Sequence, residues 1–533
     1  MHRNLTLRHT GIVVAILAVV QFAIQISLLF KGERYITSSL TIDDTYYYLQ
    51  TAWNTKQLGL VSFDGLHTTN GVQLLWFLVI YLLALLVKTK IILLFVTLAL
   101  SFLFNGLCYI FIFLIGKELN RPSLILIIAS LWALQSLPFR IYSMGMENSL
   151  HALVIWCTLW QCVIFIVRAQ NKERPNFWGL TIVLILNTWS RLDSALLSTI
   201  LFIFCTAALV LIYRKELRVF LKKYARTVIY VSLLAGFGFI TQVAAFRWMG
   251  DSYLPVSALV KTSGIARGLS AESIKMFMDV FLLGLPSILQ GRLSPIALIT
   301  LGILGILVVF LLRSKYTRQS ENLRIFINLW CCMLVGEVLY YFLIAVSGAA
   351  YLPYFAWYRS PSFIFWILTG AFVALLTFEQ IKPVSLHMNF HLWVPVGFSL
   401  AVVSIAVFLF FRSINFTSQL YTARYDTALW ISENFLPDTI FASWNAGQIG
   451  YFSNRTFINL DGVINNVDYY RRVLHGPISI ADYLAENDVD YVVDYDTYGF
   501  IPDFPILRTF PVNDGTGRSI RIWQVSSQAS SAR

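Results

Sequence analysis

Charged residues are scarce in this chain of 533 residues. Only 13% of them are charged, about half the share of a typical soluble domain. Hydrophobic residues make up 57% and aromatic residues 15%, and the mean hydropathy is +0.68. A chain with so few charges and so many long apolar runs is predicted to be a polytopic membrane protein.

Several sequence signals for catalysis are also missing. The chain has no glycine-rich phosphate loop, no nucleophile elbow and no paired-cysteine metal site, so nucleotide-driven chemistry is not supported. None of the cysteines has metal-ligand spacing to a histidine, and all lie in apolar runs, where a thiol acts as a small hydrophobic group. The six are Cys108, Cys157, Cys162, Cys205, Cys331 and Cys332.

The net charge of +12 comes largely from short basic loops between apolar runs. Three such loops, at 168–174, 214–226 and 313–324, have the charge pattern of cytoplasmic loops facing anionic lipid. This distribution argues against nucleic acid as a partner and for membrane lipid.

Eleven apolar runs are predicted to cross the membrane, with the N-terminus cytoplasmic and the C-terminus outside. The first begins after Arg3 and Arg8 and has no small-residue cleavage site, so we expect an uncleaved signal-anchor in the cell or inner membrane. The basic loops fix which side of the membrane each crossing starts from, and an additional crossing at residues 72–87 would not fit them. We therefore predict a non-crossing helix at 72–87, in a long first outer loop, 31–90. The crossings are 11–30, 91–115, 123–137, 150–167, 177–189, 195–213, 227–246, 295–312, 325–346, 362–376 and 392–411.

The composition changes at residue 415, where lysine disappears and acidic residues outnumber arginines. Short β-rich runs then alternate with helical stretches at 421–435 and 478–487, and a turn is expected at Asn445-Ala446-Gly447. We therefore predict an all-α membrane module over 1–414, of about eleven transmembrane helices, and a small α/β extracytoplasmic domain over 415–533. The predicted strands are 439–442, 457–460, 491–495 and 520–525.

Two adjacent carboxylates, Asp43 and Asp44, precede three consecutive tyrosines at 46–48. Tyrosines suit the membrane–water interface, whereas carboxylates near hydrocarbon are costly unless paired or used. The apolar spacing after them predicts a short amphipathic helix lying in the interface. One reading is that an aspartate caps this helix. The other, which we favour because a cap needs only one carboxylate, is that the pair is the reactive centre.

Other outward loops bring ionisable groups to the same face of the membrane. Glu147 ends one crossing, Arg191 and Asp193 lie between two crossings, and Lys261 and Arg359 lie in later outer loops. A single cation at an interface usually extends its charge into water. Several cations and carboxylates on one face indicate instead a site for an anionic headgroup, since lysine and arginine hold phosphate.

The order of these stretches resembles that of GT-C membrane glycosyltransferases, bacterial proteins similar to protein O-mannosyltransferases and aminoarabinose transferases. The resemblance covers nearly the whole chain. The matching stretches are Asp43-Asp44-Thr45-Tyr46-Tyr47-Tyr48-Leu49, Phe63-Asp64-Gly65, Thr69-Asn70-Gly71, Gly145-Met146-Glu147-Asn148-Ser149, Arg191-Leu192-Asp193, Pro255-Val256-Ser257-Ala258-Leu259-Val260-Lys261, the segment 442–452 and Asn459-Leu460-Asp461-Gly462.

The resemblance implies transfer of a hexosyl or pentosyl group from a polyprenyl-phosphate-linked donor to an unknown acceptor (protein, lipid or polysaccharide) on the non-cytoplasmic face. It implies Asp43 as the general base. Relatives often have Asp-Glu there, so Asp44 supports Asp43 or caps the helix. Glu147 matches a second acidic position in place but not in type.

The resemblance also places Arg191 where relatives carry a basic group that holds lipid phosphate, with Lys261 and Arg359 as further candidates. Family members differ in their dependence on a divalent metal, and this sequence has no clear ligand set or other cofactor. Substrate contacts are expected from Tyr47, Tyr48, Asp64, His67, Asn70, Trp76 and Asp193.

Two other functions compete with this one. A transporter or flippase of lipid-linked sugars would show internal repeats and broken helices near mid-membrane, and the sequence shows neither. A non-catalytic assembly protein would have little reason to keep the pair Asp43-Asp44. The flippase is the alternative hypothesis.

Overall fold

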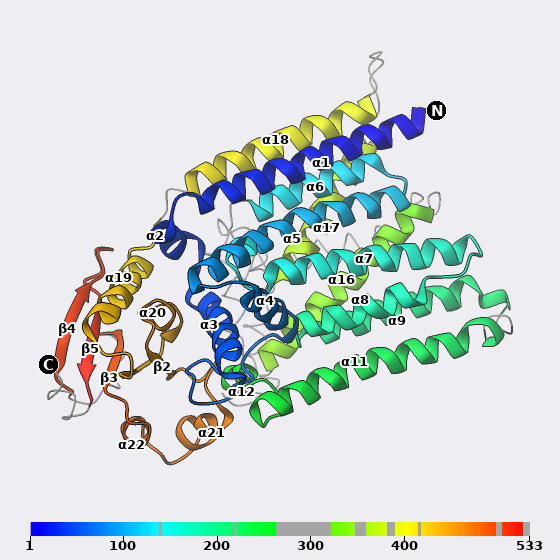
Figure 1. Ribbon diagram of the computed structural model, residues 1–533. Helices are drawn as coiled ribbons and strands as arrows, with labels where there is room; N and C mark the ends of the chain where they lie inside the picture. Colours follow the sequence, from blue (N-terminus) through cyan, green and yellow to red (C-terminus); the bar gives the residue numbers. More distant parts are fainter. Residues whose placement is uncertain are drawn as a thin grey trace.

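A bundle of long helices carries a small sheet domain at one end (Figure 1). The computed structural model describes residues 2–137, 141–216, 218, 221–262, 321–346, 359–380, 390–413, 417–496 and 504–525. The N-terminus lies at the end of the bundle away from the sheet domain.

Ten of the eleven predicted crossings coincide with helices in these ranges, and the run 295–312 lies outside the described residues. Seven helices are long and apolar enough to span a membrane, and three shorter apolar ones, α6, α8 and α17, complete the ten. The ten are α1 His2–Leu29, α5 Lys90–Glu118, α6 Pro122–Ser136, α7 Asn148–Gln170, α8 Phe177–Ser190, α9 Ser194–Ile212, α11 Arg226–Gly250, α16 Glu321–Val346, α17 Ser360–Gln380 and α18 Phe390–Ser413.

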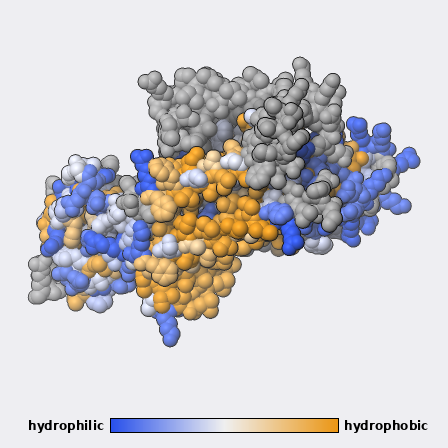
Figure 2. Space-filling model, turned by 90° about the horizontal axis from the view of Figure 1, so that it is seen from above, coloured by the Kyte–Doolittle hydropathy of each residue, from blue (hydrophilic) through white to orange (hydrophobic). Residues whose placement is uncertain are grey.

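The surface of the bundle is suited to lipid. Figure 2 shows hydrophobic side chains gathered over the middle of the molecule, between a hydrophilic sheet domain and a hydrophilic opposite end. On α11, Leu233 and Phe237 are 64% and 61% exposed. Large apolar side chains this exposed on consecutive turns would be costly in water. The integral membrane assignment is confirmed.

Helix α4 (Leu74–Leu86) does not cross the bundle, as predicted for 72–87. Its 13 residues span about 20 Å, less than the ~30 Å hydrocarbon core. A Cβ on Gly71, just before it, would lie 2.2 Å from the carbonyl oxygen of Val463. Just after it, Lys90 Nζ donates to the carbonyl of Tyr451 at 3.2 Å. Val463 and Tyr451 belong to the sheet domain, so α4 starts and ends at the same end of the bundle.

The predicted amphipathic helix is α3 (Asp43–Leu58), which follows α2 (Glu33–Tyr35) and the short π-helix η1 (Ile36–Leu40). The expectation that its tyrosines face the lipid interface is wrong. Tyr46, Tyr47 and Tyr48 are all buried, and the ring of Tyr46 packs 5.3 Å from those of Tyr451 and Phe452. The tyrosines therefore stabilise contact between the bundle and the sheet domain.

The described residues of the sheet domain (417–496 and 504–525) form five strands in the order β2-β1-β3-β5-β4, which confirms the predicted α/β character. Strand β1 is parallel to both neighbours, and β5 is antiparallel to both of its own. The mostly exposed edge strand β4 was not predicted, because it lacks a buried face. The strands are β1 Ile440–Ser443, β2 Thr456–Asn459, β3 Tyr491–Tyr495, β4 Ile506–Pro511 and β5 Ser519–Gln524.

The helices of the sheet domain include one where the sequence predicted a turn. Trp444 and Asn445 form a turn, and α20 begins at Ala446 and lies against α3. The predicted turn is therefore confirmed at Asn445, whereas Ala446 and Gly447 are helical. The helices are α19 Gln419–Asn434, α20 Ala446–Ser453, α21 Val467–Tyr469, η9 Tyr470–Leu474 and α22 Ile480–Glu486.

The contact between α20 and α3 depends on a glycine. A Cβ on Gly447 would lie 2.3 Å from the carbonyl oxygen of Asp43. Alanine normally stabilises a helix by ~1 kcal/mol over glycine, but overpacking costs about 1–3 kcal/mol. We expect Gly447→Ala to lower the thermal unfolding temperature of the purified protein. Gly397→Ala in α18, which meets no atom within 4 Å, is the control and should not lower it. Equal effects would contradict this packing.

Candidate functional site

A cavity of about 260 Å³ lies between the end of the helix bundle and the sheet domain. Its wall comes from α3, the first outer loop, the end of the loop before α7, the α8–α9 loop, α12 (Val256–Thr262), α16 and the loop after β2. Apolar residues such as Leu192 and Ile344 share this wall with ionisable ones. Seven of the thirteen predicted site residues line it: Asp44, Glu147, Arg191, Asp193, Lys261, Tyr47 and Tyr48.

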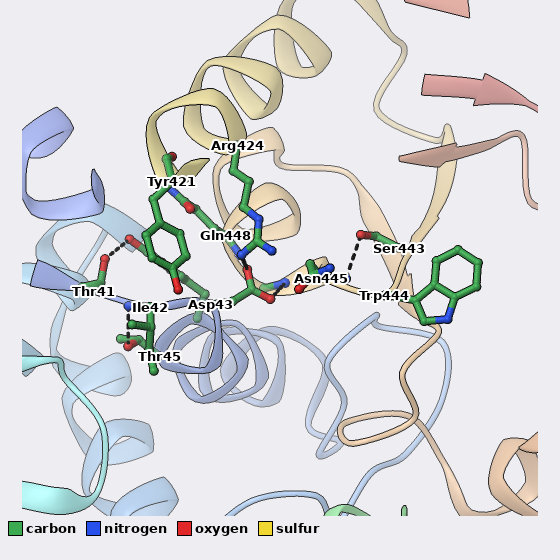
Figure 3. Close-up of polar contacts among 12 residues, drawn as sticks. Thr41, Ile42, Asp43, Thr45, Tyr421, Arg424, Ser443, Trp444, Asn445 and Gln448 are labelled. Atoms are coloured by element: carbon green, nitrogen blue, oxygen red, sulfur yellow. Dashed lines mark hydrogen bonds and ion pairs between the residues drawn. The ribbon is translucent and has the colours of Figure 1, made fainter. Parts of the chain in front are cut away.

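Asp43 is turned away from this cavity. Its carboxylate accepts from the backbone N–H groups of Gly447 at 3.2 Å and Gln448 at 2.9 Å, at the start of α20. Its Oδ1 also lies 3.3 Å from Nη1 of Arg424, whose side chain is only 4% exposed. Figure 3 shows the carboxylate between Arg424 and Gln448. Asp43 therefore joins α3 to the sheet domain, which is not the position predicted for a reactive group.

Asp44 faces the cavity instead. Consecutive residues of an α-helix point about 100° apart, so the two carboxylates of α3 cannot face the same partner. Burial raises the pKa of Asp44 to about 6; Lys261 opposes this rise, and the charges of Asp43 and Glu147 add to it. A carboxyl group with this pKa is ionised at neutral pH and more basic than an exposed one.

Arg191 is held between two carboxylates. Its Nη1 donates to Glu147 Oε1 at 2.5 Å, and its Nε and Nη2 donate to Asp193 at 3.0 and 2.9 Å. The hydroxyl of Tyr48 donates to Glu147 at 3.0 Å and that of Tyr340 to Asp193 at 3.0 Å. The guanidinium already donates to two protein carboxylates. This geometry therefore favours a role in holding one wall of the cavity in place, and it favours the predicted binding of lipid phosphate less.

Lys261 is the other cation among the described lining residues. It lies on α12, and buried Asn70 fixes the start of that helix. The Asn70 Nδ2 donates to the carbonyls of Phe246, Ser252 and Leu254 at 3.1–3.2 Å. Its Oδ1 accepts from the N–H of Val256 at 2.8 Å. Asn70 therefore positions the loop that carries Lys261, and it does not line the cavity.

The remaining predicted residues do not line the cavity. The Asp64 Oδ1 accepts from two backbone N–H groups of its own loop, and its Oδ2 lies 2.8 Å from Nδ1 of His67. This hydrogen bond raises the pKa of His67. Trp76 donates to the carbonyl of Gly145 at 3.2 Å. Arg359 is buried, with its guanidinium over the ring of Phe363. These residues shape loops and packing.

Three lining or neighbouring groups were not predicted. Tyr340 lies inside an apolar run, where nothing marks it as the partner of Asp193. Gln73 lines the cavity, and its buried Oε1 has no hydrogen-bond partner within the described part of the chain. Asp461 belonged to a matching stretch but was given no role. Within the same residues, no group of three or more His, Cys, Asp or Glu is arranged to hold a metal ion.

Comparisons with known proteins find similarity mainly at the level of structure. A family model described as a domain of unknown function (DUF8728) matches residues 413–529, and no curated protein matches the sequence. ArnT from Cupriavidus metallidurans in the apo state covers 96% of this chain and 97% of its own, at 12% identity and a TM-score of 0.49. A second ArnT structure, bound to undecaprenyl phosphate, gives a TM-score of 0.48 with the same identity and coverage.

The arabinosyltransferase EmbB from Mycobacterium smegmatis covers 92% of this chain and 45% of its own, at 11% identity and a TM-score of 0.35.

The ion pairs of Arg191 with Glu147 and Asp193 should contribute to the stability of the fold. Removing one partner of a buried ion pair leaves uncompensated charge and costs about 3–5 kcal/mol. We expect Arg191→Ala to lower the free energy of unfolding by this amount, measured by thermal or denaturant unfolding in detergent. Arg472→Ala removes an exposed arginine from its contacts with Asp468 and Glu486 and should leave stability nearly unchanged. A loss no larger for Arg191→Ala than for this control would argue against a buried charge network.

Proposed function

We propose that the protein is a membrane glycosyltransferase of the GT-C type that transfers a sugar from a polyprenyl-phosphate-linked donor to an acceptor on the non-cytoplasmic face. The observation that carries the proposal is the cavity in which Asp44 and Lys261 lie beside apolar walls, at the junction of the bundle and the sheet domain. In this proposal Asp44, and not Asp43, is the general base. The sugar and the acceptor are unspecified.

The position of the cavity suits a lipid-linked substrate. Its wall combines residues at the end of the bundle with Val463 and Ile464 of the sheet domain, and in Figure 2 the hydrophobic surface of the bundle gives way to the hydrophilic sheet domain. A donor with a polyprenyl tail can leave that tail in the bilayer while its phosphate and sugar enter at this boundary. Sugar joined to phosphate is already activated, so the reaction needs no nucleotide and no phosphate-cradling glycine loop.

Lys261 is the group that we assign to the phosphate. Lysine binds phosphate as a point charge, and α12 holds Lys261 in the wall next to Asp44. As the sugar–phosphate bond breaks, negative charge builds on the leaving phosphate, and a nearby cation stabilises it. Arg191 contributes positive charge from a fixed position between Glu147 and Asp193.

Asp44 is the group that we assign to proton removal from the acceptor. A general base works best when its pKa lies near the working pH, and burial brings the pKa of Asp44 to about 6. Glu147 lies nearby, but its Oε1 accepts from Arg191 and its Oε2 from Tyr48, so both oxygens already have protein partners. Nothing in the described residues supports the flippase alternative.

The two aspartates of α3 give the sharpest test. We expect Asp44→Asn to lower transfer by about 10²–10⁴-fold, the usual contribution of a general base, with the protein still folded. Asp43→Asn should lower the unfolding temperature but keep most of the transfer per folded molecule. The readout is the ratio of sugar-linked to free polyprenyl phosphate, measured by lipid mass spectrometry in a deletion strain carrying each variant. Loss of transfer only in Asp43→Asn would return the base to Asp43.

Transfer should also depend on pH in a defined direction. Asp44 must be ionised to accept a proton, so the rate of the wild-type protein should rise as pH increases through about 6, the pKa of its carboxyl group. The pH profile of initial rates in proteoliposomes measures this. A rate that falls over the same interval would exclude Asp44 as the base.

Lys261 is tested through donor affinity. A hydrogen bond to a charged group contributes about 1.5–3 kcal/mol, so Lys261→Gln should raise the KM for the lipid donor by about tenfold or more. Lys261→Arg, which keeps the charge, should recover much of the affinity. An unchanged KM in Lys261→Gln would remove Lys261 from the donor site.

A further inference from the structure

One face of α11 is apolar and exposed. The side chains of Leu233, Phe237 and Ile240 are all exposed, and their spacing places them in one stripe along the helix. The opposite face packs on α8, where the Gln242 Nε2 donates to the carbonyl of Thr188 at 3.0 Å. Because α11 runs along one edge of the bundle (Figure 1), this stripe is a lipid-facing surface.

Aromatic residues lie at both ends of the stripe. Tyr230 and Trp248 are 59% and 83% exposed, and about five full turns of helix separate them, so both point to the side of the stripe. At 1.5 Å per residue they are about 27 Å apart along the axis, close to the ~30 Å hydrocarbon core of a bilayer. Tyrosine and tryptophan are enriched where hydrocarbon meets headgroups. The stripe therefore matches the bilayer in length, with Trp248 at the end next to the sheet domain.

Charged groups begin at the same turn. Arg247 and Asp251, at the end of α11, form an ion pair and are both exposed. The guanidinium of Arg247 lies 5.8 Å from the centre of the ring of Tyr253, which is itself 65% exposed. Charge in hydrocarbon is costly, whereas the headgroup region accommodates charged and aromatic side chains together. The boundary between hydrocarbon and headgroups is therefore expected at this turn.

A buried asparagine joins this boundary to the helix that carries Lys261. The Asn70 Nδ2 donates to the carbonyl of Phe246, in the last turns of α11, and its Oδ1 accepts from the N–H of Val256, the first residue of α12. Lys261 follows on α12 after about one and a half turns and lines the cavity. One side chain thus fixes the end of α11 and the start of α12 relative to each other.

We propose that Trp248, Tyr253 and Leu254 form a membrane anchor. The three exposed side chains insert into the headgroup region of the leaflet next to the sheet domain, and through Asn70 they hold Lys261 at the depth of the lipid phosphates. The partner is lipid because the anchor continues the lipid-facing stripe of α11 and combines aromatic and charged groups as a headgroup region requires. The effect on the donor rests on the proposed function, but the insertion itself does not.

Insertion is tested by the depth of Trp248, without any activity measurement. Tryptophan fluorescence of the wild type and of Trp248→Phe is compared in nanodiscs of phosphatidylethanolamine and phosphatidylglycerol. A nitroxide on the lipid headgroup should quench the wild type more strongly than the variant, because only the wild type has a tryptophan at this depth. A nitroxide at the end of the acyl chain, and iodide in the water, should each give a smaller difference.

A second reporter covers the other aromatic position of the anchor. Tyr253→Trp should add fluorescence that the headgroup nitroxide quenches in the same way. A difference between wild type and Trp248→Phe that is largest with iodide would place Trp248 in water. Equal quenching of the two proteins by both lipids would show that Trp248 does not contact lipid, as when a second copy of the chain covers it. Either result would overturn the proposal.

The effect on the donor is tested by changing the length of its lipid chain. In proteoliposomes, replacing Trp248 and Tyr253 together by alanine should raise the KM for a long-chain polyprenyl donor several-fold and leave kcat nearly unchanged. The KM for a short-chain, water-soluble donor should not change, because that donor reaches Lys261 from the water. The reason is that the anchor sets the depth of Lys261 in the bilayer and does not contact the reacting groups.

Trp178→Ala is the matched control. Trp178 is also exposed, but it lies at the start of α8, and the end of α8 is the one beside the cavity. This variant should leave both KM values unchanged. An equal rise for both donors, or an equal rise in Trp178→Ala, would overturn the link between the anchor and Lys261. Insertion of Trp248 in a protein without transfer activity would instead refute the proposed function and leave the anchor standing.

Discussion

The contact of the Asp43 carboxylate with the start of α20 joins the two parts of the molecule. The N-terminus of a helix carries unpaired N–H groups and partial positive charge, which an anion stabilises. Asp43 supplies that anion to Gly447 and Gln448, and the buried Arg424 balances it. The loop after β2 lines the cavity because the sheet domain is docked against the bundle. This buried interaction is one of the contacts that hold it there, together with the packing of Tyr46 against Tyr451 and Phe452.

Because of helix geometry, the two neighbouring carboxylates point in different directions and have different roles. Because Asp43 is used for docking, the residue about 100° further round α3 faces the cavity. That residue, Asp44, meets Lys261 across the cavity, while Glu147, Arg191 and Asp193 form a rigid wall beside them. A rigid wall matters for chemistry on a lipid-linked substrate, because preorganised charge stabilises a transition state without reorganisation.

The sequence predicted the parts of this structure that depend on hydrophobic patterning. The spacing of apolar residues and the charge of the loops predicted ten of the crossings, the non-crossing segment 72–87 and four of the strands. The site was predicted only as a set of residues at one face. The orientation of Asp43 and Asp44 could not be predicted, because it depends on α20, some 400 residues along the chain. Asn70 likewise has a structural role, because its side chain makes hydrogen bonds to the backbone of Phe246 and Val256. Nothing in the sequence around Asn70 distinguishes this role from substrate binding.

We propose that the cavity beside Asp44 holds the phosphate of a polyprenyl lipid. The most direct measurement is the position of that phosphate in an experimental structure of the protein in lipid nanodiscs with added polyprenyl phosphate. We expect phosphate density in the cavity within contact of Lys261, with the lipid tail leaving along the hydrophobic surface of the bundle. Density elsewhere, with this cavity empty of phosphate, would contradict it.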